Sequence, residues 1–224
     1  LQDDRANCLT ILSGLAPKTK HETIVRNVLI PNQYCSPHFE WMVEDAMCQA
    51  GFYAEALQRM KQRYQSQVDN EWQTTLYEMF PKGGTYNHAW NAPNTILAKH
   101  IAGIRPTEPA WSEYQVEPQL QHLSMIRQNV PSVKGDIKVE MHREPERFVL
   151  LLQSPPETTA MIGIPKSFGP VKQISVDGHI VWNDGVVVDG DRGVTFADED
   201  ARFITFRVPP GDWSFVATIP ADAN

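Results

Sequence analysis

The spacing of apolar residues changes near residue 107, and no other feature of the sequence constrains the fold more strongly. Before this point apolar side chains recur at the helical period of about 3.6, as over residues 53–64. After it they alternate with polar side chains, as over residues 137–141. Because each period suits only one kind of element, we expect two domains, with helices over 1–106 and a β-domain over 107–224.

Start and stop signals divide the first part into five helices. Thr19 and Glu22 form a capping box for the second helix, and Ser36-Pro37 supplies the N-cap and first position of the third. The predicted helices end at about Gly14, Pro31, Gln49, Ser66 and Ala102. Short connections of this kind favour antiparallel helix pairs.

The second part carries the signals of a β-sandwich. Asp177-Gly178 predicts a two-residue hairpin turn, and residues 183–185 predict another. The apolar run 148–152 suits a central strand. We expect seven or eight short strands, which is typical of a sandwich. A linker should precede them, because the chain is punctuated by Pro106, Pro109 and Pro118.

Composition narrows the class of partner. The net charge of −7, from 20 basic and 27 acidic residues, argues against a nucleic acid or an anionic membrane. No apolar run approaches the roughly 20 residues of a membrane span. Cys8, Cys35 and Cys48 lack the spacing of a disulfide framework or a zinc site, so we expect core residues and no metal. No organic cofactor is indicated, and localisation stays undetermined.

The segment from residue 74 to residue 90 contains most of the candidate functional residues. It joins aromatic rings, a carboxylate, an amide and an imidazole between two predicted helices, in the residues Tyr77, Glu78, Asn87, His88 and Trp90. Aromatic faces can stack on sugar rings while the polar groups bind hydroxyls. The segment therefore suits a carbohydrate site.

The order of motifs resembles the end of glycoside hydrolase family 78, the inverting α-L-rhamnosidases. The resemblance is carried by Thr74-Thr75-Leu76-Tyr77-Glu78, Gly83-Gly84, Asn87-His88-Ala89-Trp90, the helix end at Gly103-Ile104 with Pro106, and the sandwich that follows. Residues 3–7 and 36–40 are similar to segments of that family's (α/α)6 barrel. The sequence departs from the family in having Tyr77 where Trp is common, and in a shorter stretch between Glu78 and His88.

The resemblance implies a partial (α/α)6 barrel followed by an antiparallel β-sandwich, with Glu78 as the general base. His88 and Asn87 would bind hydroxyls of a rhamnose-containing glycan or glycoside, and Trp90 and Tyr77 would shape the pocket. Inversion requires a second carboxyl group roughly 6.5–9.5 Å away, which the family carries upstream. We therefore expect a fragment of a longer protein, inactive alone, with the upstream half of the barrel as its partner. Its exposed apolar faces should promote self-association.

Simpler roles exist for several of these residues. Glu78 could be an exposed loop carboxylate, His88 or Asn87 a helix cap, and Tyr77 or Trp90 a core aromatic. Structural roles are preferred for Asp3, Asp4 and Glu40 at helix starts, and core positions for Trp182, Phe206, Trp213 and Phe215.

Two other classes of protein are open to this sequence. One is a non-catalytic carbohydrate-binding or scaffolding module. The other is a polysaccharide lyase, which is disfavoured because a lyase needs anion-neutralising basic residues that this acidic chain offers sparingly.

Overall fold

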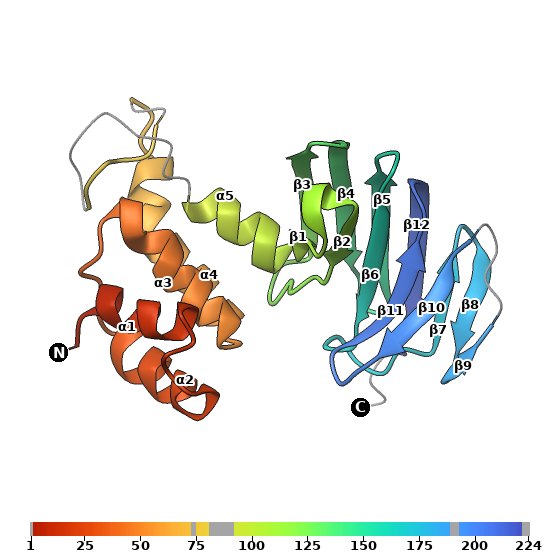
Figure 1. The fold of residues 1–224 in the computed structure, drawn as a ribbon, viewed down its shortest axis with the longest axis horizontal. Coiled ribbons are helices and arrows are strands. Elements are labelled where there is room, and N and C mark those ends of the chain that lie inside the picture. The colour runs from red at the N-terminus through yellow and green to blue at the C-terminus, as the bar shows by residue number, and fades with distance from the viewer. Residues whose placement is uncertain (1, 73–74, 81–91, 189–192, 221–224) are drawn as a thin grey trace. The chain divides into compact units, whose positions relative to one another are not determined.

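The computed structural model describes residues 2–72, 75–80, 92–188 and 193–220. The chain divides into two compact units, Leu1–His100 and Ile101–Asn224 (Figure 1). The first unit is helical and the second is built from strands, in the order that the change of apolar period predicts. Within the described residues, no helix is both long enough and apolar enough to cross a membrane.

The first unit consists of helices. Their bounds are α1 Asp4–Leu12, α2 Lys18–Ile24, the π-helical η1 Val25–Leu29, α3 Pro37–Gln49, α4 Tyr53–Val68, α5 Ala92–Ile96 and the π-helical η2 Leu97–Ile101. The predicted order of helices is confirmed, except that the predicted start of the fifth helix at His88 lies outside the described residues.

Two helix starts were predicted from capping residues. Ser36 is the N-cap of α3 and Pro37 its first residue, as predicted. The capping box at Thr19 is wrong, because α2 already begins at Lys18 and Pro17 is its N-cap. Pro17 has an extended backbone (φ −64°, ψ 146°), which its ring favours, and Thr19 therefore lies inside the first turn.

The core of the first unit lies where α1, η1, α3 and α4 meet. Its fully buried members include all three cysteines together with aliphatic side chains. The prediction that the cysteines are core residues is confirmed. The buried residues of this core are Cys8, Ile11, Val25, Leu29, Cys35, Val43, Ala46, Met47, Cys48, Ala56, Met60, Tyr64 and Ile96.

The second unit is a sandwich of two sheets. The strands are β1 Ile104–Pro106, β2 Glu113–Val116, β3 Met125–Ser132, β4 Gly135–Arg143, β5 Arg147–Ser154, β6 Thr159–Pro165, β7 Gln173–Val176, β8 His179–Asn183, β9 Val186–Val187, β10 Thr195–Glu199, β11 Phe203–Val208 and β12 Gly211–Thr218. One sheet has the order β1-β2-β6-β11-β10 and the other β3-β4-β5-β12-β7-β8-β9. All described pairs are antiparallel except β2 with β6.

The prediction of a linker before the sandwich is wrong, and the described part of the chain holds more strands than the expected seven or eight. Residues 104–116 include β1 and β2, which form one end of the five-stranded sheet, with a short 3-10 turn between them. β1 is an edge strand that ends at Pro106. An edge position tolerates proline because one side of the strand needs no N–H donor. Local sequence therefore suggested a linker where long-range pairing makes strands.

The predicted hairpins are confirmed. Asp177 (φ 49°) and Gly178 (φ 84°) connect β7 to β8, and Asp184 (φ 48°) and Gly185 (φ 85°) connect β8 to β9. Positive φ at both central residues is the requirement of a type I′ turn.

The predicted central strand is also confirmed, because β5 pairs with β4 on one side and β12 on the other. Its apolar run nevertheless has two side chains on the outer face of the sheet, of which Val149 is half-buried. Leu151 is 40% exposed, whereas the flanking Leu150 and Leu152 are buried.

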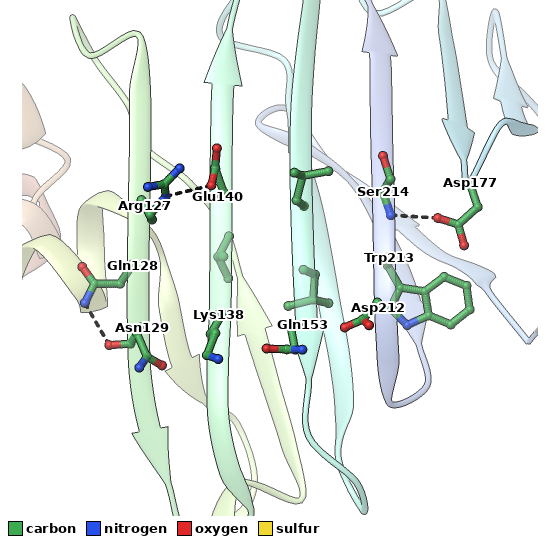
Figure 2. A pocket seen from close by; sticks show the side chains of 13 residues that line it. Arg127, Gln128, Asn129, Lys138, Glu140, Gln153, Asp177, Asp212, Trp213 and Ser214 are labelled. Atoms are coloured by element: carbon green, nitrogen blue, oxygen red, sulfur yellow. Dashed lines mark hydrogen bonds and ion pairs between the residues drawn. The ribbon is translucent and has the colours of Figure 1, made fainter.

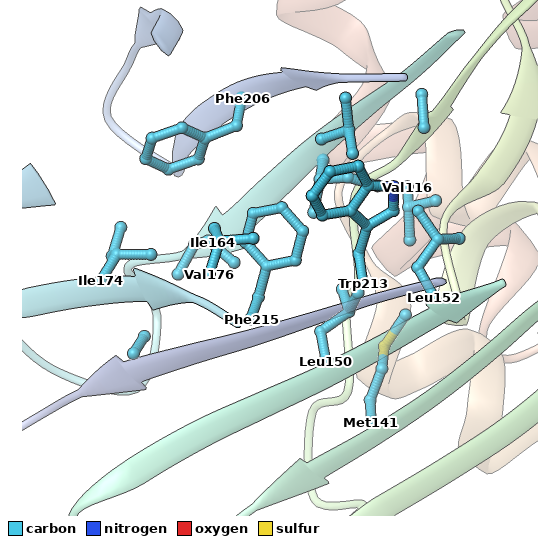
Figure 3. Close-up of a cluster of buried hydrophobic side chains, with 14 of the residues drawn as sticks. Val116, Met141, Leu150, Leu152, Ile164, Ile174, Val176, Phe206, Trp213 and Phe215 are labelled. Atoms are coloured by element: carbon cyan, nitrogen blue, oxygen red, sulfur yellow. The ribbon is translucent and has the colours of Figure 1, made fainter. Parts of the chain in front are cut away.

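Side chains from the inner faces of both sheets form the core of the sandwich (Figure 3). Phe206 of the five-stranded sheet lies 6.1 Å, centroid to centroid, from Phe215 of the seven-stranded sheet. Trp182 and Trp213 are each 5% exposed. The four aromatic residues predicted to be core are therefore confirmed as core, and the two sheets are held by the burial of large rings.

Candidate functional site

Tyr77 is fixed to the end of α4 by two hydrogen bonds. Its backbone amide donates to Gln67 Oε1 at 2.7 Å, and its hydroxyl accepts from Asn70 Nδ2 at 2.9 Å. The Tyr77 side chain is 8% exposed. The predicted site residue Tyr77 is thus a buried anchor, and the neighbouring Glu78 is only partly buried.

Phe80 anchors the other side of Glu78. The Cζ atom of Arg63 lies 4.0 Å from the centroid of the Phe80 ring. The centroids of the Phe80 and Tyr64 rings are 5.2 Å apart, and these two rings meet edge to face. Each of these contacts contributes on the order of 1 kcal/mol. Because Gln67, Arg63 and Tyr64 all belong to α4, the short segment that carries Glu78 is attached to one rigid helix on both sides of the carboxylate.

The other predicted site residues cannot be placed beside Glu78. Asn87, His88 and Trp90 lie outside the described residues. Their assignment to the same site therefore continues to depend on the motif.

A buried ion-pair network underlies α4. Arg59 Nε lies 2.5 Å from Glu40 Oε1, and Arg59 Nη2 lies 2.9 Å from Asp4 Oδ2. Arg59 also donates to the backbone carbonyls of Leu29 and Asn32. All three charged side chains are at most 3% exposed. The hydrogen bonds to Glu40 and Asp4 outweigh the cost of burial and raise the pKa of Arg59, so the guanidinium stays charged.

Arg63 extends this network towards the Glu78 segment. Arg63 Nε lies 3.0 Å from Glu40 Oε2, and Arg63 donates to the carbonyls of Gln33 and Cys35. The Cys35 thiol donates to Glu40 Oε2 at 2.7 Å. Burial and the adjacent Glu40 raise the pKa of the Cys35 thiol, so Cys35 is an inert core residue.

The structural roles expected for Asp3, Asp4 and Glu40 are confirmed, but for two of them the sequence missed the cause. Asp3 is the N-cap of α1, and its carboxylate accepts from the Arg5 amide at 2.9 Å. Asp4 and Glu40 are instead partners of Arg59, which is 55 and 19 residues away along the chain. No local sequence pattern predicts ion pairs between residues so far apart. The one sequence feature that could have indicated this network is the pair Arg59 and Arg63, four residues apart on the apolar side of α4.

Several polar atoms next to the network have no hydrogen-bond partner within the described residues. They are both carboxylate oxygens of Glu44, the hydroxyl of Tyr64 and Nε2 of Gln67. Burial, reinforced by Glu40, raises the pKa of Glu44 well above its ordinary value, so the carboxyl favours its protonated form. Buried polar groups are usually satisfied, so unpartnered ones often mark a place for water or a ligand. Tyr64 and Gln67 belong to α4, the helix that holds the Glu78 segment, and Glu44 belongs to α3.

The comparisons with known proteins relate part of the sandwich to a family model. Residues 103–177 match the family model described as "Bacterial alpha-L-rhamnosidase C-terminal domain". The chain resembles the C-terminal part of an α-L-rhamnosidase. A search of curated protein sequences gave no significant match.

Solved α-L-rhamnosidase structures share the fold. The enzyme of Dictyoglumus thermophilum is 18% identical, and the match covers 96% of this chain and 25% of that one with a TM-score of 0.78. The Streptomyces avermitilis enzyme, complexed with L-rhamnose, is 19% identical over 95% of this chain and 21% of its own, with a TM-score of 0.74. The Aspergillus terreus enzyme is 18% identical over 73% of this chain and 22% of its own, with a TM-score of 0.59.

These matches confirm the expected fold class, in which helices precede a sandwich of mainly antiparallel sheets. At such identities the likeness shows the fold alone. The chain spans about a quarter or less of the length of each rhamnosidase.

Proposed function

We propose that this chain is the C-terminal part of a glycoside hydrolase that removes terminal α-L-rhamnose with inversion of configuration. Glu78 is the general base of this proposal. The observation that carries it is the position of Glu78 within a rhamnosidase-like motif, on a segment anchored to α4 from both sides. The family match of the sandwich that follows supports it.

In this mechanism Glu78 accepts a proton from a water molecule as that water attacks the anomeric carbon. A carboxylate that is partly buried can hold such a water and still exchange with solvent. The general acid belongs to the upstream part of a longer chain, roughly 6.5–9.5 Å from Glu78, so that the water fits between the base and the sugar. The 224 residues alone would then lack half of the catalytic pair and be inactive.

The remaining site residues take supporting roles. His88 and Asn87 would bind sugar hydroxyls, and Trp90 would shape the pocket. Tyr77 would hold Glu78 in position, because its buried ring and the hydrogen bond of its hydroxyl with Asn70 fix the segment next to Glu78. The helices of the first unit would be the end of an (α/α)6 barrel, completed by the upstream helices.

Hydrolysis of an aryl α-L-rhamnoside by the longer chain, followed by proton NMR, tests the reaction. We expect β-L-rhamnose as the first product, which then mutarotates. The 224-residue chain should give no hydrolysis under the same conditions. Initial release of the α anomer, or no hydrolysis by the longer chain, would contradict the proposal.

A second candidate function is a carbohydrate-binding module without catalysis. It is favoured by a groove on the outer face of the seven-stranded sheet, which is independent of Glu78. Full hydrolytic activity of a Glu78→Gln variant, together with retained glycan affinity of the chain, would favour this role over that of Glu78 as base.

A further inference from the structure

The outer face of the seven-stranded sheet carries a groove of about 640 Å³ (Figure 2). It is lined by side chains of β3, β4, β5 and β12 and by Asp177 at the end of β7. Sites for small molecules usually hold roughly 300–1,000 Å³. The groove belongs to the sandwich alone and includes no residue of the Glu78 segment.

Strand register places the outward side chains in two parallel rows across four strands. The first row consists of Arg127, Glu140, Leu151 and Ser214, which are successive partners. The second row consists of Asn129, Lys138, Gln153 and Asp212. Figure 2 shows the four side chains of the second row lying side by side across the sheet.

The two rows differ in whether their polar side chains bind other side chains of the protein. In the first row Arg127 Nε binds Glu140 Oε2 at 2.8 Å, so both charges are occupied. In the second row Asn129 Nδ2 donates to Asp136 Oδ2 at 3.0 Å. The side chains of Lys138, Gln153 and Asp212 are exposed, and within the described residues they form no hydrogen bond. Neighbouring strands are ~4.8 Å apart, so these three side chains offer unused groups over ~10 Å.

The order of these groups matches the chemistry of vicinal hydroxyls. Lys138 only donates, Gln153 both donates and accepts, and the Asp212 carboxylate only accepts. A sugar hydroxyl can accept from a lysine or amide and donate to a carboxylate at the same time, and bonds to the charged partners are the stronger ones.

The charge and the apolar surface of the groove limit the class of ligand further. Two basic side chains and three carboxylates line the groove, a balance that disfavours a polyanion. Leu151 is 40% exposed and lies in the first row, two residues before Gln153 on the same face of β5. It offers an apolar contact next to the hydrogen-bonding row.

We propose that this groove binds a neutral saccharide, and specifically a 6-deoxyhexose unit of the glycan. The hydroxyls would bind Lys138, Gln153 and Asp212, and the methyl group of the sugar would contact Leu151. The choice of L-rhamnose as the sugar rests on the proposed function. The proposal that the groove binds a neutral saccharide does not. Because the contacts are exposed and no aromatic platform lies among the lining side chains of the first and second rows, we expect affinity in the millimolar range.

Titration of the ¹⁵N-labelled 224-residue chain with L-rhamnose tests this site. We expect saturable shifts of the Gln153 side-chain amide and of the backbone amides of Lys138 and Asp212. Glycerol at the same concentration, which presents hydroxyls without a sugar ring, should leave these signals unchanged. No shift with L-rhamnose, or an equal shift with glycerol, would overturn the proposal.

Matched variants assign the binding to the row. Asp212→Ala should weaken binding about tenfold, since it removes a charged acceptor, and Gln153→Leu about fivefold. Gln173→Leu is the control, because Gln173 lies on β7 of the same sheet but does not line the groove. Equal affinity of Asp212→Ala and the wild type would overturn the proposal. Binding is measured without hydrolysis, so failure here is distinct from failure of the proposed catalytic function.

Discussion

Gln67, in the last turn of α4, accepts a hydrogen bond of 2.7 Å from the backbone amide of Tyr77, the residue directly before Glu78. The side chain of Gln67 is 3% exposed, so this bond is shielded from water. A helix side chain thus fixes the backbone that carries the proposed general base. Through this bond, the position of Glu78 depends on a residue that makes no contact with the substrate in our mechanism.

Replacing Gln67 by methionine should therefore loosen the segment. Gln67→Met keeps the size of the side chain but removes the acceptor, and a buried unsatisfied amide costs about 1–3 kcal/mol. We expect faster hydrogen exchange of the Tyr77 amide in the 224-residue chain. In the longer chain we expect a lower kcat on an aryl rhamnoside with little change in KM.

Gln62→Met provides the control for this substitution, because Gln62 is an exposed residue of the same helix. It should leave both the exchange rate and kcat at wild-type values. Unchanged exchange at Tyr77 in Gln67→Met would show that the hydrogen bond does not hold the segment.

Removing Arg59 should destabilise the helical unit strongly. Arg59→Met leaves Asp4 and Glu40 buried without their cation, which typically costs about 3–5 kcal/mol. Arg26→Met removes an exposed ion pair with Glu22 and a contact of the guanidinium with the Phe52 ring, 4.9 Å from its centroid, and should cost only about 1 kcal/mol. Urea unfolding followed by circular dichroism at 222 nm compares the two. Equal losses would argue against the buried network as a source of stability.

The Arg59 network also shows where prediction from sequence reaches its limit. Helix ends and hairpin turns depend on a few adjacent residues, so Ser36-Pro37 and Asp177-Gly178 could be assigned from the sequence alone. Ion pairs between Arg59 and Asp4 depend on how distant helices pack, and no local pattern encodes that packing. The same reason explains why the sequence predicts a linker where the structure has β1 and β2, since their strand character comes from pairing with each other and with β6.

The candidate site was predicted only through its motif. Glu78 and Tyr77 could be selected because a short pattern joins them to a known chemistry. The support from Gln67, Arg63 and Phe80 could not be predicted, because a glutamine or an arginine on a helix is usually a solvated residue. The three unpaired side chains of the second row could not be predicted for a similar reason, since Lys138, Gln153 and Asp212 are brought together only by strand register.

Glu44 should make the stability of the chain depend on pH. Its pKa is raised in the folded state by burial and by Glu40, against the opposing effect of Arg59 and Arg63. Between the ordinary pKa and the raised one, the folded state binds more protons than the unfolded state, so stability falls as pH rises. Glu44→Gln removes this dependence and should be the more stable protein at neutral pH.

The measurement is the difference in unfolding free energy between Glu44→Gln and wild type from pH 3 to pH 8. Below the ordinary pKa the difference should be constant. Above it, the advantage of the variant should grow by up to ~1.4 kcal/mol per pH unit until the raised pKa is passed. Parallel curves across the whole range would mean that Glu44 titrates normally in the folded chain.

The 224-residue chain should self-associate. Large apolar side chains of the helical unit are exposed, including Leu15 at 80%, Tyr34 at 65% and Trp72 at 95%. Upstream helices would cover such surfaces in a complete barrel, and uncovered patches drive association. Sedimentation velocity over a range of concentrations should show a growing fraction of oligomers, and Leu15→Ser with Trp72→Ser should reduce it. A monomer at every concentration would contradict this expectation.

The most direct test of Glu78 as the general base is the hydrolysis of an aryl α-L-rhamnoside by the longer chain, comparing wild type with Glu78→Gln. Glu71→Gln is the matched control, because Glu71 is an exposed carboxylate just after α4. Loss of a general base typically lowers the rate ~10²–10⁴-fold, so we predict such a fall for Glu78→Gln and none for Glu71→Gln, with both variants folded. Wild-type activity of Glu78→Gln would contradict the assignment of Glu78 as the catalytic base.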